Sequence, residues 1–299
     1  MKVEFFTCDV FTRRRFGGNQ LAVIPDARGL NRKQMQQIAR EFNYSETTFV
    51  LPPESGHDRK VRIFTPAREV PFAGHPNIGT AFVLASSGML GEIPDGRAVT
   101  FEEEAGLVEV TLNRSDDDRL CCELLAPQQL TLGDVLMPEL AAPALSLDVA
   151  DISLAVHPPC VAGVGLPFVI VELASQEALE RACFNTAVME TLHKRGISPD
   201  ILLYVCSDGP ADVHARMFAP LDGVPEDPAT GSANCALAAL LTHYDPAESG
   251  EYAWTISQGV EMGRPSLLYA RTEKSGGSVA ATRIGGDCVM VSRGELYVA

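Results

Sequence analysis

Two short segments combine a glycine with groups that can transfer protons, each just before an apolar, alanine-rich stretch. The first holds Gly74 and His75, and the second holds Asp227, Gly231 and Ser232. A glycine before a helix lets the chain turn tightly and leaves bare N–H groups at the positive end of the helix, where they can bind a carboxylate. The Ser232 hydroxyl and the His75 ring add donors, and His75 and Asp227 are candidates for proton transfer. The sequence therefore predicts two anion-binding turns beside acid–base groups.

The two segments belong to an internal repeat. Residues 62–66, Arg-Ile-Phe-Thr-Pro, are echoed at 216–220 by Arg-Met-Phe-Ala-Pro. Residues 69–77 are then echoed at 226–234, with glutamate, proline, glycine and asparagine in step. Chance similarity between two helix starts would explain the glycine and proline but hardly the whole ordered set. The repeat predicts two like domains related by a pseudo-two-fold axis, with both turns at their interface.

Each candidate residue also has an ordinary structural interpretation. Alone, Asp227 would more often be a helix cap, His75 a hydrogen-bonded residue at a helix start, and Glu46 a carboxylate on a surface strand. Only their occurrence together with the repeat favours a functional site.

Strands outnumber helices along the chain. The expected strands are 2–9, 20–24, 45–50, 60–64, 98–101, 106–112, 121–125, 168–173, 201–206 and 214–218, with several more after Trp254. The expected helices are an amphipathic one at 32–42, capped by Asn31, and apolar ones at 75–87 and 232–243. Regular βαβ alternation is absent, so the pattern favours an α+β fold over a doubly wound parallel sheet.

Length and composition restrict the functional class. The chain has 299 residues, enough for two domains, and a net charge of −15, which disfavours a nucleic-acid partner. No apolar run is long enough to span a membrane, and no targeting segment is visible, so we expect a cytoplasmic protein. The 8 cysteines show no zinc-ligand spacing, so we expect no metal.

Three segments resemble the signature segments of the phenazine-biosynthesis PhzF-like family. They are 43–49 around Glu46, 71–76 around His75, and 226–233 around Asp227. Asp9-Val-Phe and Gly18-Asn19 near the start of the chain are also similar to the family, and the resemblance spans the chain.

The resemblance implies the diaminopimelate epimerase-like fold. This is an α+β fold of two pseudo-symmetric domains, each an antiparallel β-barrel-like sheet around a central α-helix, with the active site between them. We expect the N-terminal domain at 1–125, completed by 290–299, and the C-terminal domain at 126–289.

The resemblance also implies a cofactor-independent isomerase, commonly homodimeric, that moves a proton between carbons of a small carboxylated substrate. The residues matching the family's catalytic groups are Glu46, His75 and Asp227. The predicted substrate-binding residues are Asn19, Gly74, Gly231 and Ser232. Glu46 corresponds to the family's glutamate that moves the proton.

Two alternatives remain open. One is an epimerase or racemase that uses carboxylate and imidazole, because the two thiols used by epimerases of this fold are replaced here by Ala73 and Thr230. Cys235 lies a turn inside its helix and is expected to be a small core residue. The other is a non-catalytic metabolite-binding protein, which the joint presence of the three catalytic candidates disfavours.

Overall fold

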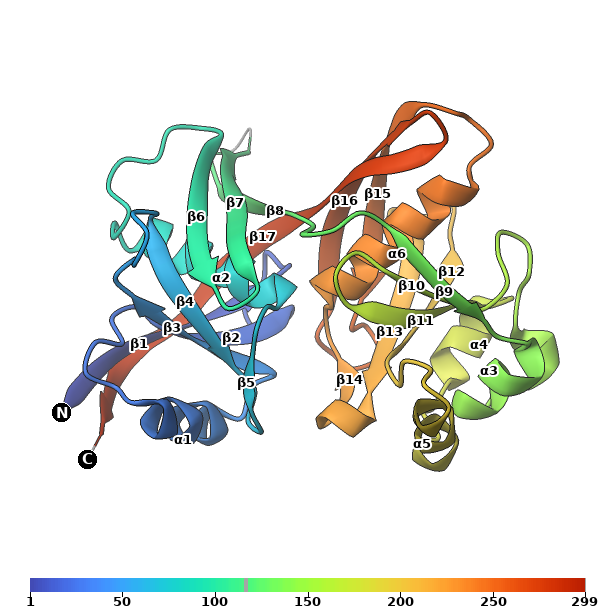
Figure 1. The fold of residues 1–299 in the computed structure, drawn as a ribbon, viewed down its shortest axis with the longest axis horizontal. Helices are drawn as coiled ribbons and strands as arrows, with labels where there is room; N and C mark the ends of the chain where they lie inside the picture. The colour runs from blue at the N-terminus through green and yellow to red at the C-terminus, as the bar shows by residue number, and fades with distance from the viewer. Residues whose placement is uncertain (116–117, 299) are drawn as a thin grey trace. The chain divides into compact units, whose positions relative to one another are not determined.

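The computed structural model describes residues 1–115 and 118–298 and divides into two compact units (Figure 1). Unit 1 comprises Met1–Leu125 together with the chain from Gly285 onward, and unit 2 comprises Ala126–Ile284. The final residue of the predicted 290–299 segment lies outside the described residues.

Unit 1 is a mixed sheet with two helices. Its elements are β1 (Lys2–Val10), β2 (Asn19–Ile24), α1 (Arg32–Phe42), β3 (Glu46–Leu51), β4 (Arg59–Phe64), β5 (Glu69–Val70), α2 (Gly74–Ser86), β6 (Arg97–Glu103), β7 (Gly106–Arg114), β8 (Leu120–Leu125) and the second half of β17 (Ser278–Tyr297). β1 lies between β2 and β17 and is antiparallel to both. The pairs β2–β3 and β4–β6 are parallel, because α1 and α2 lie in the connections between them.

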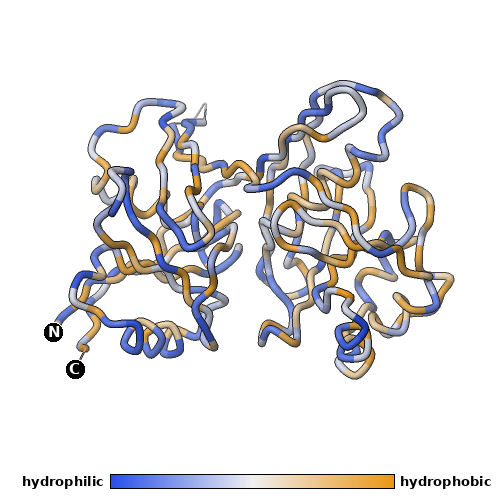
Figure 2. The backbone as a smooth tube through the Cα atoms, in the orientation of Figure 1, coloured by the Kyte–Doolittle hydropathy of each residue, from blue (hydrophilic) through white to orange (hydrophobic). Residues whose placement is uncertain are grey.

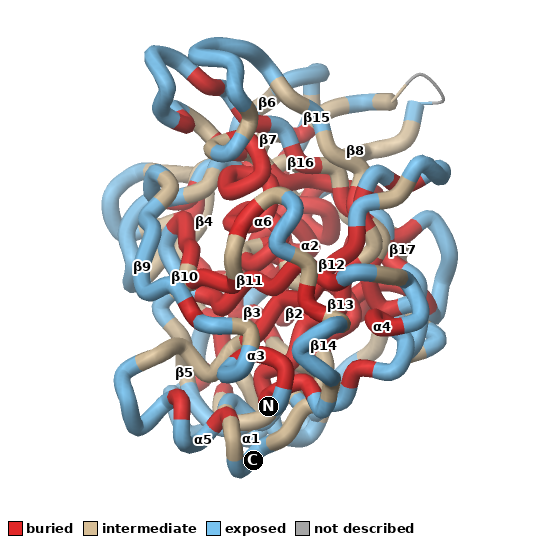
Figure 3. Tube along the Cα trace, turned by 90° about the vertical axis from the view of Figure 1, so that its right-hand side faces the viewer, coloured by how far each residue is buried: buried red, intermediate tan, exposed pale blue. Residues whose placement is uncertain are grey.

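Helix α2 occupies the centre of unit 1. Every residue from Gly74 to Ala85 is buried, and strands β1, β2, β3, β7 and β8 pack around the helix (Figure 3). Gly79 permits this close packing, since a Cβ there would lie 2.5 Å from Leu21 Cδ2. Helix α1 is different: only Met35, Ile38 and Ala39 are buried, and Figure 2 shows it as largely hydrophilic.

Unit 2 also has strands around one buried helix, and it contains several further short helices. Its elements are β9 (Thr131–Val135), α3 (Pro138–Ala144), η1 (Val149–Asp151), β10 (Cys160–Gly163), β11 (Pro167–Glu172), α4 (Gln176–Arg181), α5 (Thr186–Lys194), β12 (Ile201–Cys206), β13 (Val213–Ala219), η2 (Pro220–Asp222), β14 (Val224–Asp227), α6 (Gly231–Tyr244), β15 (Gly250–Gln258), β16 (Ser266–Ser275) and the start of β17. Helix α6 is buried from Gly231 to Thr242, with Ser232 the only partly exposed residue in that span, and packs on β10, β11, β15 and β16.

The predicted α+β class is confirmed, and so are the amphipathic helix at 32–42 and the two apolar helices. The expectation of purely antiparallel sheets is wrong in part. Besides the parallel pairs of unit 1, the pairs β11–β12 and β13–β15 in unit 2 are parallel. The elements missed from the sequence are strands β5, β9, β10 and β14, helices α3, α4 and α5, and the short 3-10 helices η1 and η2. Helices α3–α5 are short and bury only a few small or aliphatic side chains each, so their periodic signal is weak.

Candidate active site

Three of the predicted site residues meet in unit 1. Glu46 is the first residue of β3, and His75 is the second residue of α2. Glu46 Oε2 lies 3.5 Å from His75 Nε2, and on the other side of the ring Asn19 Nδ2 lies 3.3 Å from His75 Nδ1. Asn19 reaches the ring because Gly18 before it adopts a φ of +63°, which turns the chain into β2.

His75 is held in its neutral form. Its side chain is 6% exposed, while that of Glu46 is 18% exposed. Burial lowers the pKa of His75 from 6.5 to about 3, although a hydrogen bond with the Gln20 backbone opposes this change. His75 Nε2 is buried and has no hydrogen-bond partner of good geometry among the described residues. The arrangement therefore places a partly accessible carboxyl group beside a neutral imidazole.

The two predicted turns are built alike. The N-cap residues of α2 and α6 are Ala73 and Thr230, and the side chain of neither caps the first turn of its helix. One turn further on, Asn77 and Asn234 each donate from Nδ2 to the N-cap carbonyl, at 2.9 Å in both cases. First-turn N–H groups without a side-chain cap give each helix the capacity to bind an anion.

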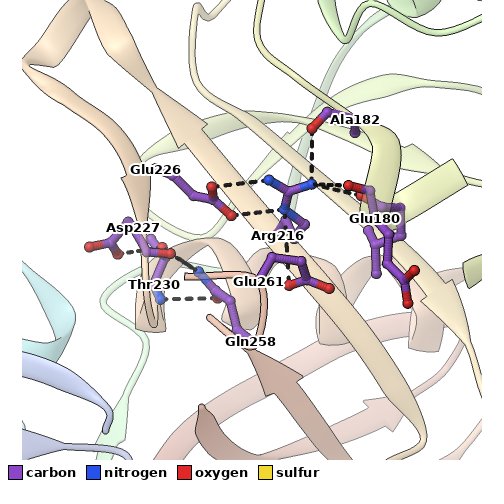
Figure 4. A network of polar contacts seen from close by, with 9 residues as sticks. Glu180, Ala182, Arg216, Glu226, Asp227, Thr230, Gln258 and Glu261 are labelled. Atoms are coloured by element: carbon purple, nitrogen blue, oxygen red, sulfur yellow. Dashed lines mark hydrogen bonds and ion pairs between the residues drawn. The ribbon is translucent and has the colours of Figure 1, made fainter. Parts of the chain in front are cut away.

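Asp227 lies beside the second turn, in unit 2 (Figure 4). It ends β14 and is 7% exposed, and its Oδ2 accepts a 2.6 Å hydrogen bond from the Thr230 hydroxyl. Gln258 Nε2 donates to the Asp227 carbonyl at 2.7 Å, and Asn234 Nδ2 donates to Gln258 Oε1 at 2.7 Å. Ser232, the second residue of α6, is partly exposed.

The arginine and glutamate of the repeat form an ion pair in each unit. Arg62 Nε donates to Glu69 Oε1 at 2.6 Å, and Arg216 Nε donates to Glu226 Oε1 at 2.8 Å (Figure 4). Each arginine makes a second bond to the other oxygen of its glutamate. These pairs tie the strand before each turn to the segment that leads into it.

The repeat did not point to Glu103 or Gln258. Both lie outside the repeated segments, at the ends of β6 and β15, and only strand pairing brings them to the helix starts.

In the part of the chain that the structure describes, no group of three or more His, Cys, Asp or Glu side chains is arranged to hold a metal ion. No helix within 1–115 or 118–298 is both long enough and apolar enough to cross a membrane.

The whole chain, strand-rich units and buried helices included, is similar to known proteins. A family model described as "Phenazine biosynthesis-like protein" matches residues 8–294. An uncharacterized isomerase of Mesorhizobium japonicum is 38% identical, and a trans-2,3-dihydro-3-hydroxyanthranilate isomerase of Pseudomonas aeruginosa is 34% identical, each match covering 99% of both chains. The protein is thus an isomerase, and its chain belongs to the phenazine biosynthesis-like (PhzF) family.

Solved structures confirm the fold. The crystal structure of a PhzF-family phenazine biosynthesis protein from Bacillus anthracis superposes with a TM-score of 0.90 at 26% identity, covering 100% of both chains. A hydroxyproline epimerase from Agrobacterium vitis superposes with a TM-score of 0.66 at 14% identity, covering 99% of this chain and 91% of that one. The second likeness concerns the fold alone and agrees with the predicted epimerase-like architecture.

Proposed function

We propose that this isomerase moves a proton between carbons of a small carboxylated substrate without a cofactor, and that Glu46 carries the proton. The observation that supports this most directly is the 3.5 Å approach of Glu46 Oε2 to the buried, neutral His75. A carboxylate in a largely dry environment is a stronger base than one in water, and its partial exposure leaves a path for the substrate.

The proposed reaction is balanced without any co-reactant. The Glu46 carboxylate takes a proton from a substrate carbon, and the electron pair of the broken C–H bond becomes part of a double bond shifted along the substrate. The carboxylic acid so formed returns the proton to a second carbon and regenerates the carboxylate. His75 and Asp227 polarise or protonate the substrate while the charge is displaced.

The substrate carboxylate is proposed to bind at the two helix starts. The first-turn N–H groups after Gly74 and Gly231 supply donors, and the Ser232 hydroxyl and the Asn19 amide add two more. This requires the two units to form the predicted pseudo-symmetric pair with one shared site. A crystal structure with a bound carboxylate tests it: contacts from both helix starts to one carboxylate are expected, and a ligand held by one unit alone would contradict it.

An epimerase or racemase that uses carboxylate and imidazole is the second candidate, favoured by the fold shared with a hydroxyproline epimerase. A mechanism that uses two cysteine thiols is excluded, because the positions before Gly74 and Gly231 hold Ala73 and Thr230.

Incubation with trans-2,3-dihydro-3-hydroxyanthranilate in D₂O separates the two candidates. This compound is chosen because the 34% identical relative is named as its isomerase. We expect a shifted double bond, with activity kept after dialysis against a chelator. Deuterium incorporation with inversion at a stereocentre and no double-bond shift would favour the epimerase, and no turnover of this or related cyclic carboxylates would refute the proposal.

A further inference from the structure

Glu103 and Gln258 occupy corresponding positions in the two units. In unit 1, Arg59 of β4 pairs in parallel with Phe101 of β6, and in unit 2, Val213 of β13 pairs in parallel with Ile256 of β15. Arg59 and Val213 each lie three residues before the arginine of the repeat, Arg62 or Arg216. Their partners Phe101 and Ile256 each lie two residues before Glu103 or Gln258. Strand register therefore makes Glu103 the counterpart of Gln258, although the sequences around them are dissimilar.

Gln258 closes the turn before α6. It is fully buried, and its Nε2 donates to the Asp227 carbonyl at 2.7 Å. Its Oε1 accepts from Asn234 Nδ2 at 2.7 Å and from the Thr230 backbone N–H at 3.2 Å. Its Nε2 also donates to the Thr230 hydroxyl at 3.2 Å, so one carboxamide acts as both donor and acceptor within this turn.

Glu103 lies at the start of α2, next to the counterparts of the groups that Gln258 binds at the start of α6. Both of its carboxyl oxygens are buried and lack a well-formed hydrogen bond among the described residues, and its carboxyl interacts with the side chain of Asn77. Asn77 is the repeat counterpart of Asn234 and makes the same 2.9 Å bond to its N-cap carbonyl, that of Ala73. In the repeat, Val70 stands where unit 2 has Asp227, whose carbonyl accepts from Gln258.

A carboxylic acid can replace a carboxamide in this role, whereas a carboxylate cannot. The acid has one O–H donor and can also accept, which matches the bonds of Gln258 to the Asp227 carbonyl and from Asn234, whereas a carboxylate only accepts. The second donor bond of Gln258, to the Thr230 hydroxyl, has no counterpart in unit 1, because Ala73 stands at that position. We propose that Glu103 acts as a protonated acid, a positioning residue that closes the turn before α2 by accepting from Asn77 and donating to the Val70 carbonyl. Its effect on catalysis rests on the proposed function, because this turn carries Gly74 and His75.

The surroundings of Glu103 favour the protonated form. Glu103 lines a cavity of about 540 Å³. The charged groups on that cavity are Lys60 and Arg62, and the carboxylates of Glu54, Glu69, Glu102 and Glu104. Both cations are already paired, Lys60 with Glu54 at 2.6 Å and Arg62 with Glu69 at 2.6 Å. Burial raises the pKa of Glu103 to about 8, against a smaller opposing effect of the Asn77 side chain.

The protonation state is tested without any assay of activity. The full-length protein is labelled with ¹³C at the glutamate carboxyl carbon, and the Glu103 signal is assigned by its loss in E103Q. We expect an acid signal at pH 6.5 that converts to carboxylate near pH 8. A carboxylate signal at pH 6.5 would overturn the proposal, whether or not the proposed reaction is correct.

The positioning role is tested by the pH profile of kcat/KM. The wild-type protein is expected to lose activity above about pH 8. E103Q should keep at least a third of the activity at pH 7 and lack the alkaline loss, whereas E103A should lose at least tenfold at every pH. E102Q, a change at the adjacent residue, should keep the wild-type profile. An alkaline loss that persists in E103Q, or a folded E103Q as inactive as E103A, would overturn the role.

Thermal unfolding gives a second readout. Because the folded pKa of Glu103 is raised above the ordinary 4.5, its contribution to stability is complete below pH 4.5 and is lost as pH rises to about 8. The Tm of the wild-type protein should therefore fall relative to that of E103Q across this range. Parallel Tm curves for the two proteins would contradict a protonated Glu103.

Discussion

Glu46 Oε2 lies 3.5 Å from His75 Nε2, although the two residues come from different elements, the first residue of β3 and the second residue of α2. The contact depends on parallel pairing of β2 with β3, in which Leu21 is opposite Glu46. Leu21 also packs against Gly79 of α2. This packing holds β2, and with it the paired strand β3, against the helix that carries His75. The carboxyl group therefore faces a ring whose position is set by the core of unit 1.

His75 should remain neutral across the physiological pH range. With its pKa lowered from 6.5 to about 3, its ring C–H resonances should not shift between pH 8 and pH 5. Because the folded pKa of His75 is lowered, its contribution to the stability of the folded protein is complete above pH 6.5 and is lost as pH falls toward 3. The wild-type protein should lose stability relative to H75N between pH 7 and pH 4.5, and an NMR midpoint near 6.5 would contradict the account.

Gly18 should be far less tolerant of substitution than Gly91. Both have positive φ, +63° and +70°, so alanine costs about 1–2 kcal/mol at either position. At position 18 a Cβ would also lie 2.3 Å from the Val10 carbonyl oxygen, whereas at position 91 nothing lies within 4 Å. G18A should therefore lose clearly more unfolding free energy than G91A in urea titrations, and equal losses would show that the turn before Asn19 is not tightly constrained.

Much of the fold was readable from the sequence because its elements carry strong local signals. Helix α1 has a capping box formed by Asn31 and Gln34 and an apolar stripe, and its predicted bounds, 32–42, are confirmed. Helices α2 and α6 are apolar on all sides, which is typical of a helix enclosed by strands.

The candidate site was only partly predictable. The repeat pointed to the helix starts, since the glycine and asparagine that shape them are local. The contact between Glu46 and His75 depends on strand order, and the equivalence of Glu103 with Gln258 depends on register between strands distant in sequence. Parallel pairing through helical crossovers leaves no local pattern from which such contacts can be derived.

Removing Arg216 should destabilise the protein more than removing Arg62. The Arg216 side chain is 8% exposed, pairs with Glu226, and also donates to the carbonyls of Leu179 and Ala182. R216M leaves the partly buried Glu226 carboxylate and three backbone carbonyls, those of Leu179, Glu180 and Ala182, without this partner, a loss of about 3–5 kcal/mol. Arg62 is 24% exposed, so R62M should cost about 1–2 kcal/mol. Denaturant unfolding of both variants measures the loss of unfolding free energy. Equal losses in R216M and R62M would show that the burial of the arginine does not determine its contribution to stability.

The Ser232 hydroxyl should contribute to binding more than to the chemical step. A hydrogen bond to a carboxylate that is the same before and during reaction lowers KM without raising kcat. S232A should raise KM about tenfold, equivalent to about 1.4 kcal/mol, and change kcat less than threefold. The exposed Ser278 provides the control, as S278A should change neither constant. A loss confined to kcat would instead assign Ser232 to the chemistry.

The proton-carrying role of Glu46 is tested most directly by E46Q, which keeps the size and polarity of the side chain and removes its basicity. Turnover of trans-2,3-dihydro-3-hydroxyanthranilate, the compound named for the Pseudomonas aeruginosa relative, is measured together with calorimetric binding of a non-reacting analogue, hydroxyanthranilate. E41Q, on the exposed side of α1, is the control. The account predicts that E46Q loses at least 100-fold in kcat while binding stays within about threefold, and that E41Q matches the wild-type protein. An E46Q protein that still shifts the double bond at more than a tenth of the wild-type rate would contradict it.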